Sequence, residues 1–218
     1  MTSVTIAGEE LELRAECAAY WPRMRTLLIA DPHFGKAASF RTLGVYVPAG
    51  TTEHALGRLD KIIASTNPEN LVFLGDFLHA REGRNEQTFA ALAEWRARHA
   101  GIRMQIVRGN HDYRAGDPPS EVGIECVDGP LSMPPFCLAH HPVASSKGYV
   151  LAGHIHPCAV LLGPAKQRER LPCFSFGASV GILPAFGEFT GCAEVDTSDL
   201  ESCWVIAHDE VVRVRGPA

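Results

Sequence analysis

Aspartate, histidine and asparagine side chains gather in five short clusters between residues 31 and 156. The clusters are Asp31-Pro32-His33, Gly75-Asp76, Gly109-Asn110-His111-Asp112, His140-His141 and Gly153-His154-Ile155-His156. Carboxylate, imidazole and amide oxygen together suit divalent metals such as Mn, Fe or Zn. These groups outnumber the four ligands of one tetrahedral ion, whereas two ions about 3.5–4 Å apart with a bridging carboxylate would use them. The clusters therefore predict a two-metal site, which polarises a phosphoryl oxygen and lowers the pKa of a bridging water.

The ordinary alternative is a set of polar surface loops. Seven of the ten histidines fall in or beside the clusters, which argues against chance placement. The other three, His54, His99 and His208, are expected at the surface or hydrogen-bonded within the fold.

Each cluster follows an apolar run of the kind that forms a buried strand. These runs cover residues 26–30, 70–75, 102–107, 136–140 and 149–153. Helical patterns over 51–66 and 86–100 separate the first three runs, and this alternation predicts a parallel layout. Ligands in open α/β sheets gather at the carboxyl edge of the strands, so five strand ends at one edge would form a single pocket.

The second half of the chain has a different character. Beyond residue 120 the helical patterns stop, and short strands are expected in "CFSFG", "CAEVD", "CWVIAH" and "EVVRVR". A sheet-rich half packed on an α/β half predicts a layered α/β sandwich. With 218 residues and no repeat or linker, one domain over residues 1–218 is expected.

Composition limits the class of protein. The net charge of −5 lacks the basic excess of a non-specific DNA-coating protein, so an anionic ligand must be held locally by metal or a few arginines. No segment resembles a signal peptide or approaches the roughly 20 apolar residues of a membrane span, and a cytoplasmic protein without membrane contact is expected. Seven cysteines, an odd number without a CxxC pair, favour reduced, mostly buried thiols over a disulfide framework.

The order D-x-H, GD, GNHD, strand-end His and GHxH resembles the calcineurin-like metallophosphoesterase superfamily over residues 31–156. The resemblance implies a four-layer α-β-β-α sandwich and two divalent metal ions, with manganese favoured over iron or zinc. The segments "ADPHFGKAASFRTLGVYVPAGT" and "LPAFGEFTG" are similar to the bacterial ligase-associated DNA-damage-response endonucleases of this superfamily. This branch implies a phosphodiesterase acting as a DNA endonuclease in DNA repair, and association with a DNA ligase and a helicase. Cys192 stands where the branch often has glycine.

The resemblance also assigns metal ligands residue by residue. One metal would be bound by Asp31, His33 and His156, the other by Asn110, His140 and His154, and Asp76 would bridge the two. His140 is preferred over His141 because it directly ends its strand, although the neighbouring histidine is the alternative.

Catalytic roles follow for two further residues of the GNHD cluster. By resemblance, His111 would face the scissile phosphate and stabilise the developing charge or protonate the leaving oxygen. Asp112 would orient His111 without binding metal.

Substrate-binding candidates follow the first two motifs. By resemblance, His79 would contact the nucleic-acid backbone or form a hydrogen bond near the metals; an ordinary loop histidine is the alternative. Phosphates beside the cleaved bond could be held by Lys36, Arg41, Arg81 and Arg84, and a solvated surface is an equal alternative for each.

Three aromatic residues have competing interpretations. Trp21 and Trp95 could stack on nucleobases, although a core position is preferred for Trp95 on its amphipathic helix, and Phe186 is expected to pack in the interior.

Two competing functions remain at this point. A small phosphoester, a cyclic nucleotide or a nucleotide-sugar lipid precursor could replace DNA as the substrate. A non-catalytic scaffold with this fold is the other alternative, but such proteins typically lose motif residues, and this chain retains them.

Overall fold

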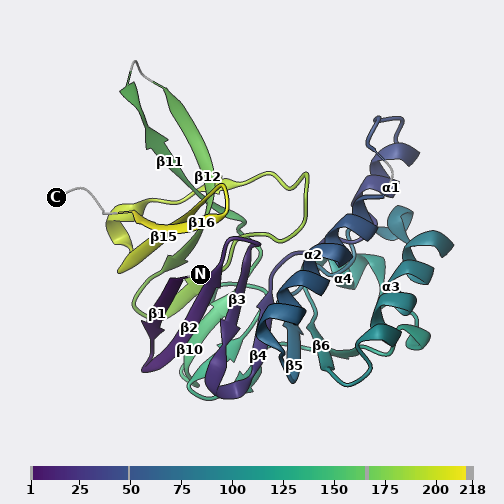
Figure 1. Cartoon of the computed structure of the whole chain (residues 1–218), viewed down its shortest axis with the longest axis horizontal. Coiled ribbons are helices and arrows are strands. Elements are labelled where there is room, and N and C mark those ends of the chain that lie inside the picture. Colours follow the sequence, from purple (N-terminus) through teal and green to yellow (C-terminus); the bar gives the residue numbers. More distant parts are fainter. Residues whose placement is uncertain (1, 49, 165–166, 215–218) are drawn as a thin grey trace.

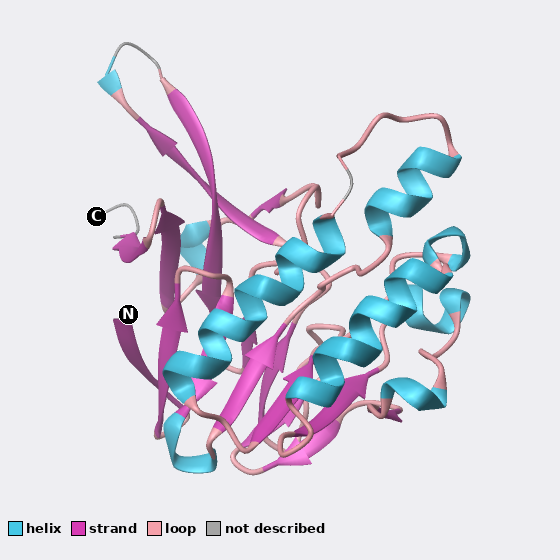
Figure 2. Cartoon of the chain, turned by 45° about the vertical axis from the view of Figure 1, so that its right-hand side comes forward, coloured by secondary structure: helices cyan, strands magenta, loops and turns pink. Residues whose placement is uncertain are grey.

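The computed structural model describes residues 2–48, 50–164 and 167–214. Two β-sheets pack face to face, and α-helices cover the outer face of the first sheet (Figures 1 and 2). No helix in these ranges is long and apolar enough to cross a membrane.

The first sheet contains seven strands in chain order. They are β1 (Thr2–Ile6), β2 (Glu9–Arg14), β3 (Ala18–Trp21), β4 (Thr26–Ile29), β5 (Asn70–Phe73), β6 (Arg103–Val107) and β7 (Glu125–Val127). Strands β4 to β7 are parallel, which confirms the predicted layout of the first three apolar runs. The antiparallel β1–β3 segment was not predicted, although the alternation that buries Leu11 and Leu13 of β2 is a period-two signal.

Four α-helices belong to this half of the molecule. They are α1 (Lys36–Thr42), α2 (Thr51–Thr66), α3 (Glu86–Arg98) and α4 (Asn110–Ala115). The two predicted helices, 51–66 and 86–100, are confirmed as α2 and α3, and α3 ends two residues early. The short helices α1 and α4 were not predicted, because six or seven residues are too few to establish a helical period.

The second sheet is built from the C-terminal half. Its strands are β8 (Leu131–Met133), β9 (Phe136–Leu138), β10 (Tyr149–Ala152), β11 (Pro157–Leu162), β12 (Arg168–Phe176), β13 (Val180–Ile182), β14 (Ala193–Glu194), β15 (Ser202–Ala207) and β16 (Glu210–Val214). The order is β14-β11-β12-β13-β10-β9-β8, with β15 joining β12 to β16. The strands expected in this half are present, although residue 215 of the last one lies outside the described residues.

The remaining helical pieces are single 3-10 turns. The described ones are η1 (Pro22–Met24), η2 (Arg81–Gly83), η3 (Ser120–Val122) and η5 (Thr197–Asp199). The expected α/β sandwich with two sheets is confirmed. Among the described residues beyond Ala115, helical structure is limited to 3-10 turns, so the fourth, helical layer is reduced in this chain.

The hydrophobic core lies on both faces of the first sheet. In β4, Leu27 and Ile29 face helices α2 and α3, whereas Leu28 faces the second sheet. All four residues of β4 are therefore buried, as expected of a strand covered on both sides. This double cover holds the carboxyl end of β4 rigidly in place.

The two tryptophans with a possible stacking role lie in the core. Trp21 and Trp95 are fully buried, and their indole N–H groups donate to Glu9 at 2.7 Å and to Asp60 at 2.8 Å. The base-stacking alternative is therefore wrong for both. Phe186 is buried as expected.

The expectation of reduced thiols is wrong for one pair, because Cys158 and Cys192 form a disulfide. Strand β11 pairs with β14, and this pairing brings the two residues together although they are 34 positions apart. The other cysteines of the described chain are free: Cys17, Cys126, Cys137, Cys173 and Cys203. The sequence could not reveal the pair, since strand pairing places it.

Candidate active site

The five polar clusters meet in one place, but they come from two sheets rather than from one edge. Asp31 and His33 follow β4, and Asp76 and Asn110 follow β5 and β6 of the first sheet. His140, His154 and His156 follow β9 and β10 of the second sheet. The single predicted pocket thus forms where the carboxyl ends of two packed sheets converge.

Two glycines allow this close approach, each making room for a side chain of the opposite sheet. A Cβ atom at Gly75 would overlap the imidazole of His140, and the φ of +82° at Gly75 also favours glycine. A Cβ atom at Gly153 would overlap the carboxylate of Asp31. Glycine at both motif positions is therefore a packing requirement of the site.

The first cluster joins Asp31, His33 and His156. The two Nε2 atoms of the histidines lie 3.4 Å apart, and His156 Nε2 lies 3.7 Å from Asp31 Oδ2. The Nδ1 atom of His156 donates to the carbonyl of Gly191 at 3.2 Å, which leaves Nε2 with a free lone pair. Lone pairs that converge in this way provide ligands for a cation.

The second cluster joins Asn110, His140 and His154. His140 Nε2 lies 2.9 Å from Asn110 Oδ1 and 3.1 Å from His154 Nδ1. His140 Nδ1 donates to the carbonyl of Leu74 at 3.0 Å, so the Nε2 lone pair faces the other acceptors. The structure therefore brings together the side chains expected for a second metal.

Asp76 lies between the two clusters. Its Oδ1 is 3.4 Å from His140 Nε2, and its Oδ2 is 3.9 Å from His33 Nε2. The backbone N–H of His111 donates to Oδ1 at 2.9 Å. One carboxylate oxygen thus faces each cluster, which is the placement that a bridging ligand needs.

Neighbouring His141 lies at the rim. It is exposed, and its ring centroid is 4.4 Å from that of His154. His140, by contrast, is 2% exposed and contacts both Asn110 and Asp76.

Backbone strain is concentrated in this site. Five of the candidate ligands have φ between 48° and 72°, a region that non-glycine residues rarely adopt: Asp31, His33, Asp76, His154 and His156. Such conformations cost on the order of 1–3 kcal/mol each and persist where function and surrounding structure impose them. The fold is thus less stable for holding these five residues in conformations that direct their side chains into the site.

Burial sets the protonation of the imidazoles. It lowers the pKa of His33 to about 2 and the pKa values of His79 and His140 to about 4, and the nearby charge of Lys36 adds to the effect at His33 and His79. At His156 burial acts in the same direction, but the hydrogen bond and charge of Asp31 outweigh it and raise the pKa. Neutral His33 and His140 at pH 7 are ready to bind metal without first losing a proton.

These residues fit a pair of divalent cations. Asp31 Oδ1 and His33 Nδ1 are buried and have no hydrogen-bond partner within the described residues. Buried polar atoms rarely stay unpaired in the absence of an ion or water. The mixture of carboxylate, imidazole and amide oxygen suits Mn, Fe or Zn.

Asp112, which was expected to orient His111, forms its hydrogen bonds with backbone groups rather than with the His111 ring. His111 Nδ1 lies 2.5 Å from the carbonyl oxygen of His79. The carboxylate of Asp112 instead accepts the backbone N–H groups of Gly109 at 2.9 Å and Leu78 at 3.1 Å. Asp112 therefore holds the turn before α4, because two buried amides need an acceptor there.

His79 lies beside the metal-binding cluster. Its ring stacks on His111 with centroids 5.1 Å apart and meets the edge of His33 at 5.3 Å. His79 thus lies beside the candidate ligand His33, and its expected role in substrate binding stays a prediction.

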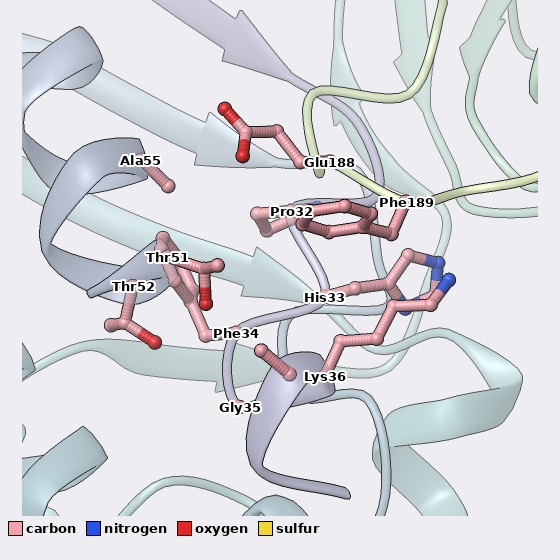
Figure 3. Close-up of a pocket in the computed structure, with 11 residues that line it drawn as sticks. Pro32, His33, Phe34, Gly35, Lys36, Thr51, Thr52, Ala55, Glu188 and Phe189 are labelled. Atoms are coloured by element: carbon pink, nitrogen blue, oxygen red, sulfur yellow. The ribbon is translucent and has the colours of Figure 1, made fainter. Parts of the chain in front are cut away.

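Lys36 is the one proposed phosphate-binding residue beside a candidate ligand. It is half-buried, and its ammonium end extends past the ring of His33 (Figure 3). His33 and Lys36 line a small cavity together with Pro32 and Phe189, and the ring of Phe189 lies beside Pro32 (Figure 3). The sequence did not point to Phe189.

The three arginines donate to backbone carbonyls. Arg41 contacts Val47 and Pro48 at 3.4 and 3.1 Å, and Arg81 contacts Arg114 at 2.8 Å. Arg84 bonds Gly116 and Asp117 at 2.9 and 2.7 Å, so all three guanidinium groups support loops.

Tyr113 is a second residue that the sequence analysis missed. It lies two positions after His111 on α4, and the residue is 63% exposed. Its place directly after the GNHD cluster was the available signal.

Comparison with known proteins identifies the family. The calcineurin-like phosphoesterase family model matches residues 24–159. The chain belongs to the calcineurin-like phosphoesterase family. It is therefore a hydrolase, a metal-dependent phosphodiesterase, as the order of motifs predicted.

One solved structure supports this assignment. The crystal structure of Pseudomonas putida nuclease MPE is 42% identical, covers 98% of this chain and 99% of that chain, and superposes with a TM-score of 0.88. The E. coli phosphoesterase Yfce is 13% identical over 87% of this chain and 97% of its own, with a TM-score of 0.38. Among curated proteins, no sequence matches this chain.

Proposed function

We propose that this phosphodiesterase is a nuclease that cleaves DNA in a repair process, with manganese as its metal. The observation that carries the proposal is the 42% identity to a bacterial nuclease across 98% of the chain. Association with a DNA ligase and a helicase, and a cytoplasmic location, stay predictions from the sequence.

The proposed metal ligands are the two clusters that share Asp76. One ion would be held by Asp31, His33 and His156, and the other by Asn110, His140 and His154. When bound, the metal pair supplies Lewis acidity toward a phosphoryl oxygen and toward water.

Several groups of the chain itself have proposed roles in the reaction. The carbonyl of His79 accepts the Nδ1 proton of His111, so a proton given to the leaving oxygen would come from Nε2 of the imidazolium form of His111. The backbone N–H of His111 fixes Asp76. Lys36 places a positive charge beside His33, where it would attract a phosphate.

The decisive experiment measures turnover of bis(p-nitrophenyl) phosphate with added Mn²⁺, together with metal content. The wild-type chain should hold close to two ions and show metal-dependent turnover. Asp76→Asn should lose about two to four orders of magnitude in kcat, since a shared carboxylate contributes several kcal/mol to such a site. Full activity of Asp76→Asn in well-folded protein would refute the proposed site, and Asp60→Asn on α2, whose side chain bonds Trp95 and His99 rather than a candidate ligand, is the matched control.

A small phosphoester is the competing substrate, and the net charge of −5 favours it over long DNA. Cleavage of single- and double-stranded DNA at increasing salt separates the two. A nuclease that holds the DNA backbone loses affinity steeply as salt rises, whereas turnover of a small diester responds weakly. Absence of DNA cleavage by a chain that cleaves the aryl diester would reject the nuclease proposal.

A further inference from the structure

A cavity of about 340 Å³ adjoins the metal-binding residues on the side of the second sheet. Its lining includes His140, His141, Pro130, Val143 and Tyr113. We call it the Tyr113 cavity. This volume is at the small end of the range for ligand sites, about 300–1,000 Å³.

The chemistry of its walls favours a flat, uncharged, aromatic occupant. Ala139, Val143, Ala144 and Val150 supply an apolar surface, and the side chain of Val143 is 71% exposed. Tyr113, a residue that is 63% exposed, adds an aromatic ring to this lining. Apolar walls with an aromatic platform are the features that bind nucleobases by stacking.

The ring of Tyr113 is held in position before any ligand arrives. Its hydroxyl donates to Asp128 Oδ1 at 2.9 Å. The same oxygen accepts from Arg108 at 3.0 Å, and Arg108 makes two further bonds to Asp117 at 2.7 and 2.8 Å. A platform fixed in this way loses little freedom when a base stacks on it.

The same network excludes a phosphate from the Tyr113 cavity. The nitrogens of Arg108 donate to two carboxylates, so its charge is already balanced and its fork is occupied. The cavity therefore lacks the free cationic fork that phosphate binding uses.

The position of the Tyr113 cavity indicates which nucleotide of the substrate it would bind. His140 lines this cavity, and its Nε2 lies 3.4 Å from Asp76 Oδ1, whereas His111 does not line it and has its Nε2 3.9 Å from Asp76 Oδ2. His111 serves the leaving oxygen in the proposed function, so the cavity lies on the side of the retained nucleotide. We infer that the Tyr113 cavity binds the nucleobase of the retained nucleotide, stacked on Tyr113; this inference rests on the proposed nuclease function.

The test compares two manganese-dependent substrates of the full chain: thymidine 5′-(p-nitrophenyl phosphate), which carries a base, and methyl p-nitrophenyl phosphate, which does not. Wild-type kcat/KM should be higher for the nucleotide ester. Tyr113→Ala should reduce that preference by about 5- to 150-fold, mainly through KM, which corresponds to the loss of one stacked base. Tyr113→Phe keeps the ring and should retain most of the preference, whereas Val143→Glu should abolish it by placing a charge in the apolar lining.

Tyr46→Ala is the matched control, because Tyr46 is a 92% exposed tyrosine that does not line this cavity. It should leave both substrates unaffected. Equal losses on the two esters in Tyr113→Ala, or an undiminished nucleotide preference, would overturn the base subsite. A wild-type chain that hydrolyses the methyl ester without any nucleotide preference would refute the subsite alone. Hydrolysis of neither ester would refute the proposed function together with it.

Discussion

His111 Nδ1 lies 2.5 Å from the carbonyl oxygen of His79, and this backbone acceptor fixes the tautomer of the imidazole. The other nitrogen, Nε2, is 3.9 Å from Asp76 Oδ2. One residue thus touches the proposed bridging ligand through its backbone and faces it through its ring. The Nδ1 proton is thus held by the carbonyl, and the proton that the imidazolium form of His111 would give away is the one on Nε2.

His111→Ala should reduce kcat on DNA by about 10²- to 10⁴-fold, the usual contribution of a general acid. The loss on bis(p-nitrophenyl) phosphate should be much smaller, because p-nitrophenolate leaves without being protonated. Parallel kinetics on the two substrates measure this difference. Equal losses would mean that His111 acts on the phosphate and not on the leaving group, and His208→Gln, outside the site, provides the control.

Asp112→Ala should lower the free energy of unfolding by about 2–4 kcal/mol, since the buried N–H groups of Gly109 and Leu78 would lose their acceptor. Asp112→Asn should cost less, because the amide oxygen still accepts one of the two bonds. Urea unfolding of the metal-free proteins checks both. If Asp112→Asn instead kept full stability and lost as much kcat as His111→Ala, Asp112 would be an orienting residue after all.

The metal-free protein should lose stability in acid through His140. Burial lowers the pKa of this histidine to about 4, from its ordinary value of about 6.5. As the pH falls, His140 is therefore protonated in the unfolded chain before it is protonated in the folded chain. The free energy of unfolding decreases between pH 6.5 and about 4 for this reason. The decrease is about 1.4 kcal/mol per pH unit.

Urea unfolding of wild type and His140→Asn at pH 7.5 and 5.0, after chelation of metal, isolates this contribution. The stability of wild type should fall by about 2 kcal/mol relative to the variant over that interval. A constant difference between the two proteins would show that His140 titrates normally in the fold.

Cys192→Ala should lower the free energy of unfolding by about 2–4 kcal/mol, the usual effect of opening a disulfide-closed loop. A reductant should lower the free energy of unfolding of the wild-type protein by a similar amount. Metal affinity should also fall, because Cys192 follows Gly191, whose carbonyl holds His156. Thiol titration of unfolded, non-reduced protein should detect five of the seven cysteines; seven would exclude the bond, and Cys126→Ala is the matched variant.

Local patterns in the sequence were sufficient for much of the fold and for the members of the site. Helix α2 follows from its periodicity over residues 51–66, and β4 from its unbroken apolar run. The types and order of Asp31, Asp76 and His154 already indicate metal and phosphate chemistry. These features depend on short-range periodicity and on the chemistry of single side chains, both of which a sequence displays directly.

Only the tertiary structure decided which groups touch. It placed Gly75 against His140 and Gly153 against Asp31, and so made one site from two sheets. It also paired the His111 ring with the backbone carbonyl of His79, which is 32 residues away in the sequence. Backbone carbonyls are identical in every residue, and strand pairing joins positions far apart in the chain. A local pattern therefore does not encode such partners; packing of the two sheets selects them.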